Sequence, residues 1–235
     1  MTQQNDNRLV KSRHDYQPPA FSISTVKLCF ELDKVATKVT SVMQFKRLRQ
    51  AEPLVLAGQH LRLLSVALNG EVLSADAYHL DENCLTLPSV PEQFELTVVT
   101  QLSPQTNTAL EGLYLAGDTY CTQCEAEGFR RISYFLDRPD VLAEYFVTII
   151  APATPYPFLL SNGNKVSEHV DAAGNRVVQW HDPFPKPSYL FALVAGDFDQ
   201  LTEQFTTQSG RAVALQLFVD KGAASKGDFA LQALK

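Results

Sequence analysis

The sequence predicts a mainly β fold, arranged as an antiparallel β-sandwich or a saddle-shaped pair of sheets. Short apolar and polar alternations recur along the chain, turn residues separate them at close spacing, and helical periodicity is almost absent. Many short strands at such spacing are typical of packed antiparallel sheets and not of a doubly wound α/β fold. The 235 residues, of which 45% are hydrophobic, suffice to bury a core as one large or two small domains.

The first strand is expected after a flexible polar tail that covers residues 1–19, with structure beginning at Phe21. A period of two then places one row of side chains inward and one outward, which indicates a half-buried strand. The inward row consists of Val26, Leu28, Phe30 and Leu32. Similar alternating or β-branched runs occur at residues 36–47, 94–100, 145–150, 176–180, 189–198 and 211–219.

Glycine and proline residues mark the turns between these strands. Asn162-Gly163 lies between two apolar runs and Gly174-Asn175 precedes Val177, so both are predicted as hairpin turns. The segment from Asp182 to Pro187 holds three prolines, each of which fixes φ and removes an amide donor. We expect a loop or an edge segment there that leads into the next strand.

Two short helices are predicted. Residues 137–144 begin with Asp137 as a possible cap and have a proline in the first turn. Residues 225–235 have Asp228 as a possible cap, followed by apolar residues at helical spacing. Those apolar residues are Phe229, Leu231 and Leu234. Because the pattern stops at Lys235 without a glycine cap, the chain is expected to belong to a longer polypeptide.

Charge and composition exclude several classes of function. With 20 Lys+Arg against 26 Asp+Glu, the net charge is -6, which argues against binding of nucleic acid through phosphates. No apolar run approaches the roughly 20 residues that span a bilayer, so no membrane partner is expected. The polar residues 1–10 lack the apolar core of a signal peptide, and the four cysteines are few and unevenly spaced. A cytoplasmic protein with reduced thiols is therefore expected.

The chain contains no complete catalytic motif and no expected metal site. It lacks G-x-S-x-G, a phosphate-binding glycine loop and H-E-x-x-H. The five histidines are scattered, and Glu168-His169 is an isolated pair, whereas zinc requires three or four convergent ligands. Cys121 and Cys124 form a C-x-x-C pair, which is compatible with half a zinc site, with a redox pair, or with two reduced residues of a core or loop.

Gln123 and Glu125 are the candidate binding residues. If residues 123–125 are extended, these two side chains project from one face while Cys124 turns to the other. An amide and a carboxylate side by side could hold a cationic group through a charge-assisted hydrogen bond. Spacing alone favours a solvated polar strand face over such a site.

Several segments, in collinear order over nearly the whole chain, resemble the amino-terminal domain of the bacterial aminopeptidase N family, zinc aminopeptidases of the gluzincin type. The segments are NTALEGLY at residues 107–114, CTQCEAEGFRR at 121–131, LDRPDVLA at 136–143, YPFLLSNGN at 156–164, DPFPKP at 182–187 and YLFALVAGDF at 189–198.

The resemblance implies an all-β domain at residues 20–197, followed at 198–235 by the first strands of a truncated thermolysin-like catalytic domain. It implies that Glu125 helps to hold the free α-ammonium of a peptide substrate and that Gln123 lines the same pocket. The family's G-A-M-E-N and H-E-x-x-H motifs and its oxyanion-stabilising tyrosine do not occur in this chain. Zinc is therefore expected outside this chain, in the catalytic domain that would be its partner, and the chain alone is expected to be inactive.

A second hypothesis is a stand-alone β-sandwich that binds a ligand or a partner protein. Trp180, Phe184 and Tyr189 could form a ligand-binding face, although aromatic residues of β domains usually belong to the core. A reading frame that continues past Lys235 into H-E-x-x-H would exclude this hypothesis. A zinc or redox protein built on Cys121 and Cys124 is a third possibility.

Overall fold

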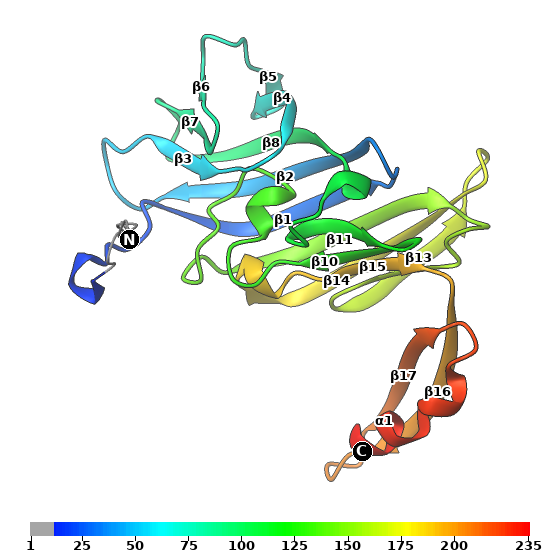
Figure 1. Cartoon of the computed structure of the whole chain (residues 1–235). Coiled ribbons are helices and arrows are strands. Elements are labelled where there is room, and N and C mark those ends of the chain that lie inside the picture. Colours follow the sequence, from blue (N-terminus) through cyan, green and yellow to red (C-terminus); the bar gives the residue numbers. More distant parts are fainter. Residues whose placement is uncertain (1–11) are drawn as a thin grey trace, which may run out of the picture.

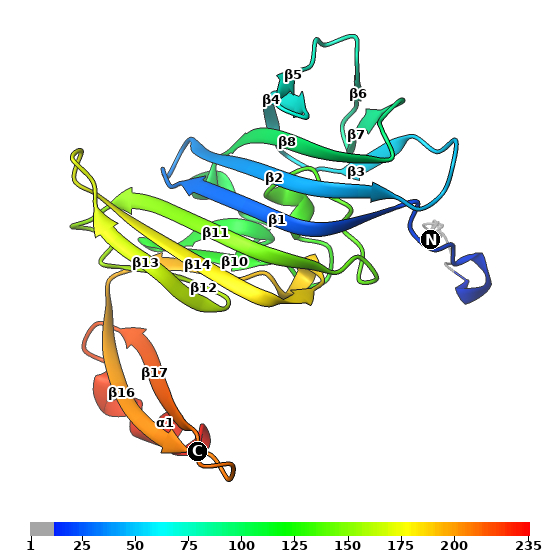
Figure 2. The ribbon, with the colours of Figure 1, turned by 180° about the vertical axis from the view of Figure 1, so that it is seen from behind.

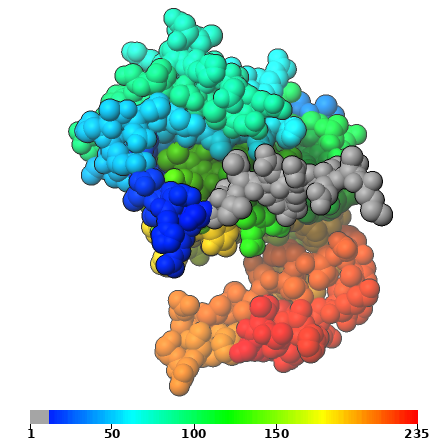
Figure 3. Space-filling model, turned by 60° about the vertical axis from the view of Figure 1, so that its left-hand side comes forward, coloured from blue at the N-terminus to red at the C-terminus, as the bar shows by residue number. Residues whose placement is uncertain are grey.

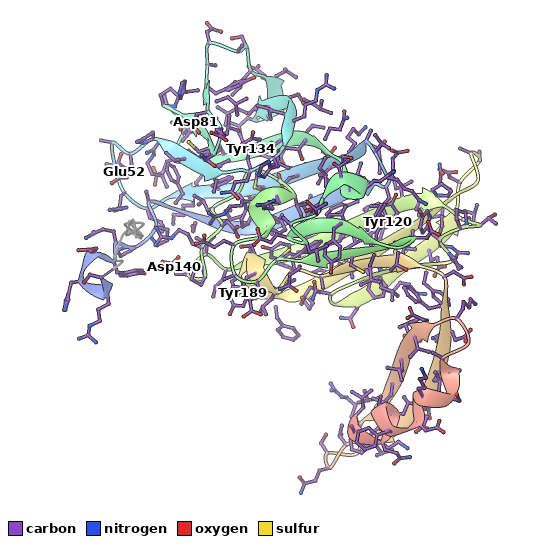
Figure 4. The ribbon with its side chains drawn as sticks, viewed as in Figure 1. Glu52, Asp81, Tyr120, Tyr134, Asp140 and Tyr189 are labelled. Atoms are coloured by element: carbon purple, nitrogen blue, oxygen red, sulfur yellow. The ribbon has the colours of Figure 1, made fainter. Side chains whose placement is uncertain are left out.

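The computed structural model describes residues 12–235, and most of its regular secondary structure is β-strand (Figure 1). The predicted mainly β class with antiparallel sheets is confirmed. Residues 1–11 of the predicted tail lie outside the described residues. The described part of the tail contains the single turn η1 (Arg13–Asp15), and the Tyr16 hydroxyl donates to Asp140 Oδ2 at 3.0 Å. Figure 4 shows Asp140 beside this N-terminal segment.

A twisted eight-stranded sheet forms one layer (Figures 1 and 2). Its order is β13 (Asn164–Val170), β14 (Asn175–Lys186), β11 (Ala143–Pro152), β1 (Phe21–Glu31), β2 (Thr37–Arg47), β8 (Gln93–Leu102), β4 (Arg62–Leu68) and β5 (Glu71–Val72). All neighbours are antiparallel except β1 and β11, which run parallel. The alternation predicted for β1 is confirmed, since Val26, Leu28 and Phe30 are buried.

Two smaller sheets complete the body of the molecule. The four-stranded sheet has the order β12 (Phe158–Ser161), β15 (Leu193–Gly196), β10 (Thr119–Gln123) and β9 (Gly112–Ala116). The three-stranded sheet has the order β3 (Leu54–Ala57), β7 (Cys84–Leu87) and β6 (His79–Leu80). Both views place β10 and β15 against β11 and β14, and Phe30 of β1 stacks on Phe191 with ring centroids 5.8 Å apart. One cluster of buried residues joins the large sheet to both smaller sheets and forms the core.

A two-stranded hairpin, β16 (Phe198–Thr206) and β17 (Ala212–Asp220), projects from this sandwich together with η5 (Ala224–Lys226) and α1 (Asp228–Ala233). Figure 3 shows this part below the sandwich, with open space between them on one side. Phe158 of β12 contacts it through the rings of Phe198 and Phe218, with centroids 6.2 and 5.2 Å away. The division into domains at residues 197 and 198 stays a prediction.

The helix predicted over residues 137–144 is wrong. Pro139 and Asp140 form a turn, and β11 begins at Ala143. Val141, Ala143 and Tyr145 are all buried, so the segment has the period of a strand and pairs with β14. The C-terminal helix is confirmed as α1, but its N-cap is Gly227 and Asp228 lies inside the first turn. No helix within residues 12–235 is long and apolar enough to cross a membrane.

Asn162-Gly163 is not a hairpin turn. β12 before it belongs to the four-stranded sheet and β13 after it belongs to the eight-stranded sheet, so this turn passes the chain from one layer to the other. Gly174 does belong to a hairpin, which joins the paired strands β13 and β14. The proline-rich segment continues β14 to Lys186, but its pairing with β13 ends at His181, which confirms an edge segment.

The turns at Gly163 and Gly174 offer a matched test of local packing. Gly163 and Gly174 have nearly equal φ values of +84° and +83°, but a Cβ at Gly163 would lie 2.3 Å from His181 O, whereas a Cβ at Gly174 meets nothing within 4 Å. Gly174→Ala is expected to cost about 1–2 kcal/mol of unfolding free energy from φ alone. Gly163→Ala should cost a further 1–3 kcal/mol or so for the backbone shift. Urea unfolding of both variants checks this, and equal losses would contradict the crowding at Gly163.

Candidate functional site

Gln123 and Glu125 lie where β10 ends. Gln123 and Glu125 are exposed and Cys124 between them is 2% exposed, as the alternation predicts. The predicted extended conformation stops at Gln123, however, because Glu125 begins a turn that runs to Gly128. Gln123 Nε2 donates to the backbone oxygen of Glu125 at 3.2 Å, and the peptide bond between Glu125 and Ala126 is cis. We call residues 124–128 the acidic turn.

Two glycines allow the acidic turn to pack closely against β9. Gly112 is the first residue of β9, pairs with Gln123 and has a φ of +72°. The Gly128 amide donates to Cys124 O at 2.8 Å, which closes the turn. A Cβ at Gly128 would lie 2.4 Å from Gln123 O, and one at Gly112 would lie 2.7 Å from Arg131 Cβ. Larger residues would therefore force these backbone segments apart.

The helical turn η3 (Phe129–Arg131) follows directly and anchors the acidic turn in the core. Phe129 is 0% exposed, and its ring contacts those of Phe135, Phe191 and Tyr145. Edge-to-face pairs of this kind add about 0.5–1.5 kcal/mol beyond the burial of their area. The acidic turn is thus held between the end of β10 and a fixed aromatic cluster.

Arg130 of η3 binds a buried carboxylate. Asp137, whose side chain is 1% exposed, accepts hydrogen bonds from the Arg130 backbone N at 3.1 Å and from its Nε at 3.0 Å. Its other oxygen accepts from the Ser188 hydroxyl at 2.6 Å. Arg130 Nη1 also reaches Glu127 Oε2 at 3.2 Å, inside the acidic turn. Sequence reasoning missed this set of contacts because it assigned Asp137 to a helix cap.

Glu125 differs from its acidic neighbour Glu127. Within residues 12–235, none of the ion pairs of the structure involves Glu125, whereas Glu127 is paired with Arg130. Because Gln123 uses its Nε2 on a backbone oxygen, its amide oxygen is the atom left to accept a hydrogen bond. The exposed carboxylate and this amide oxygen are both acceptors, which suits a ligand that carries N–H donors and a positive charge.

The cysteines do not form a thiol pair. All four are free, and Cys121 of β10 is half-buried while Cys124, directly after β10, is buried. Burial raises the pKa of the Cys124 thiol, and the nearby Asp137 charge raises it further. A redox or metal-binding thiol requires the opposite shift. In the described part of the chain, no group of three or more His, Cys, Asp or Glu side chains could hold a metal ion.

Comparison with known proteins shows the family. Residues 14–190 match the model of the peptidase M1 N-terminal domain. The chain belongs to this family. The resemblance found in the sequence is thereby confirmed. The matched residues cover β1 to β14 and stop before β15, which belongs to the four-stranded sheet.

Relatives of this M1 N-terminal domain are much longer than the chain. Aminopeptidase N of Escherichia coli K12 is 51% identical over 236 residues, covering 100% of this chain and 27% of that protein. Aminopeptidase N of Caulobacter vibrioides is 50% identical, covering 94% and 26%. The crystal structure of Legionella pneumophila aminopeptidase A in complex with aspartic acid has a TM-score of 0.91 and 34% identity, covering 95% and 27%. The chain thus spans about a quarter of the length of these relatives.

An M1 zinc metallopeptidase of Deinococcus radiodurans has the same fold at 14% identity and a TM-score of 0.73. That match covers 86% of this chain and 48% of the other. The two proteins therefore share the β-sandwich fold although their sequence identity is low.

Proposed function

We propose that this chain is the N-terminal part of a zinc metalloaminopeptidase that removes amino-terminal residues from peptides, and that Glu125 with Gln123 binds the substrate's free α-ammonium. The observation that carries the proposal is the exposed Glu125 carboxylate. It takes part in none of the ion pairs within residues 12–235, and it lies on the acidic turn between Gln123 and the buried Phe129. The family and the long relatives named aminopeptidase N support the class of reaction.

The part played by this chain is recognition of the amino end. An ammonium group placed at the acidic turn would donate to the Glu125 carboxylate and to the Gln123 amide oxygen. A charge-assisted contact of this kind contributes roughly 1.5–3 kcal/mol. Holding the amino end at a fixed place restricts cleavage to the first peptide bond, which is what an aminopeptidase requires.

The described residues of this chain include no group of side chains that could hold the proposed zinc ion. We place the zinc in the catalytic part of the polypeptide. That part is the proposed partner of this domain. We also propose a cytoplasmic location, which the four free thiols support because disulfides are rare in reducing compartments.

An activity assay tests the proposal. The 235-residue chain, with zinc added, is expected to leave aminoacyl arylamides intact, while a polypeptide that joins this chain to its catalytic part hydrolyses them. N-acetylation of the same substrate removes the positive charge, and it should abolish turnover by the longer polypeptide. Hydrolysis by the 235-residue chain alone, or equal turnover of the acetylated substrate, would refute the proposal.

A further inference from the structure

The conformation of the acidic turn is determined by the residues that follow it. The turn is closed between Cys124 O and the Gly128 amide, so Glu125 lies within a short loop whose two ends meet. One end continues from β10, which is fixed by pairing with β9 and β15. The other end enters η3, whose second residue is Arg130.

Asp137 holds Arg130 at three points. Its Oδ2 accepts from both the backbone amide and the Nε of Arg130, and its backbone oxygen accepts from Arg130 Nη2 at 3.2 Å. One residue thereby fixes both the main chain and the guanidinium plane of Arg130. Because Ser188 of η4 (Ser188–Leu190) binds the second carboxylate oxygen, Asp137 is itself held against rotation.

The contacts continue from Arg130 into the acidic turn. Arg130 Nη1 lies 3.2 Å from Glu127 Oε2, two residues beyond Glu125. The side chains of Arg130 and Asp137 are only 18% and 1% exposed, so solvent screens this pair weakly, in contrast to the exposed ion pairs elsewhere on the surface. A buried ion pair adds little net stability relative to apolar packing, but it fixes geometry well when every partner is satisfied.

We propose that Asp137 is a positioning residue for substrate recognition: through Arg130 it sets the conformation of the acidic turn and so the direction of the Glu125 carboxylate. Its part in recognition rests on the proposed role of Glu125. Asp137 touches no substrate in this scheme, and its effect on activity passes entirely through Glu125.

A double-mutant cycle in the polypeptide with its catalytic part tests the proposal. Asp137→Asn keeps the size of the side chain but removes its charge. We expect kcat/KM for an aminoacyl arylamide to fall about tenfold, mainly through a higher KM. The reason is that a misplacement of a substrate-binding group by about 1 Å can reduce the rate on the order of 100-fold. In a Glu125→Ala background the same change should have no further effect. A role limited to stability would lower activity equally in both backgrounds.

Asp140→Asn is the matched control. Asp140 lies three residues further along and binds Arg138 at 2.7 and 2.8 Å, but it makes no contact with the acidic turn among the described hydrogen bonds. We expect wild-type kinetics for this variant. If Asp137→Asn does not fold, Arg130→Lys replaces it, because lysine keeps the charge but loses the forked contact with Asp137.

Hydrogen exchange of the 235-residue chain gives a readout that is independent of activity. The Gly128 amide, which donates to Cys124 O within the acidic turn, should exchange faster in Asp137→Asn than in Asp140→Asn, while the amides of β1 and β2 stay equally protected. Unchanged exchange in the acidic turn, or additive kinetic losses in the cycle, would overturn the positioning role. A Glu125→Ala variant with normal kinetics would instead refute the proposed function and leave the exchange result to decide whether Asp137 orders the turn.

Discussion

Replacing Glu125 with alanine, in the polypeptide that joins this chain to its catalytic part, is expected to reduce kcat/KM by about 2–5 kcal/mol of transition-state stabilisation. The physical reason is that the substrate's ammonium group would have no anionic partner at the acidic turn. Steady-state kinetics with an aminoacyl arylamide measures the loss.

The acidic turn supplies the control for this variant. Glu127 is also exposed and lies two residues away, but it is already paired with Arg130. Exposed ion pairs contribute only about 0–1 kcal/mol, and the acidic turn is also held by the Gly128 amide and by the main chain of Arg130, so Glu127→Ala should reduce kcat/KM far less than Glu125→Ala. Similar losses in the two variants would mean that general negative charge, and not the position of Glu125, attracts the substrate. Unchanged kinetics in Glu125→Ala would remove this residue from the site.

Phe129→Ala is expected to reduce the free energy of unfolding by about 3–5 kcal/mol, because it empties a fully buried position surrounded by aromatic rings. The nearest ring, that of Phe135, is 4.8 Å away between centroids, and the ring of Phe191 is 5.4 Å away. Denaturant unfolding of the 235-residue chain measures the change.

Phe229→Ala removes the same side chain from a surface position. Phe229 of α1 is 85% exposed, so the expected change lies within about 0.5 kcal/mol. A comparable loss in the two variants would show that the cluster around Phe129 does not stabilise the core as its packing indicates.

The sequence predicted the long strands well because the alternation of apolar and polar residues is repeated several times in each of them. β1, β2, β8 and β11 each span ten or eleven residues with one buried face. Strands such as β3, with four residues, offer too few repeats for the period to be recognised. The prediction of a hairpin at Asn162-Gly163 is wrong because a glycine with positive φ serves equally well in a hairpin turn and in a turn between two sheets. Which of the two forms depends on the strands that β12 and β13 pair with, and these are distant in sequence.

Asp137 shows how tertiary contacts override a local pattern. An aspartate followed by a proline two residues later is typical of a helix start, but its carboxylate binds Arg130, seven residues earlier, and Ser188, 51 residues later. Such partners have no fixed spacing in a sequence. The exposure of Gln123 and Glu125 followed from alternation, whereas the turn at Glu125 did not. Spacing offered them as a pair that could hold a cation but favoured a solvated strand face. The resemblance then assigned them to substrate binding, which stays a proposal.

The parallel pairing of β1 with β11 has a consequence for synthesis of the chain. β1 and β2 are neighbours in sequence and can pair early, but the other side of β1 receives its partner only after β2 to β10 have left the ribosome. Until then, the nascent chain exposes a long strand with open backbone donors and acceptors, which favours aggregation. Polypeptides that end before Ala143 should therefore depend on chaperones, and those that extend past Pro152 should be released from them.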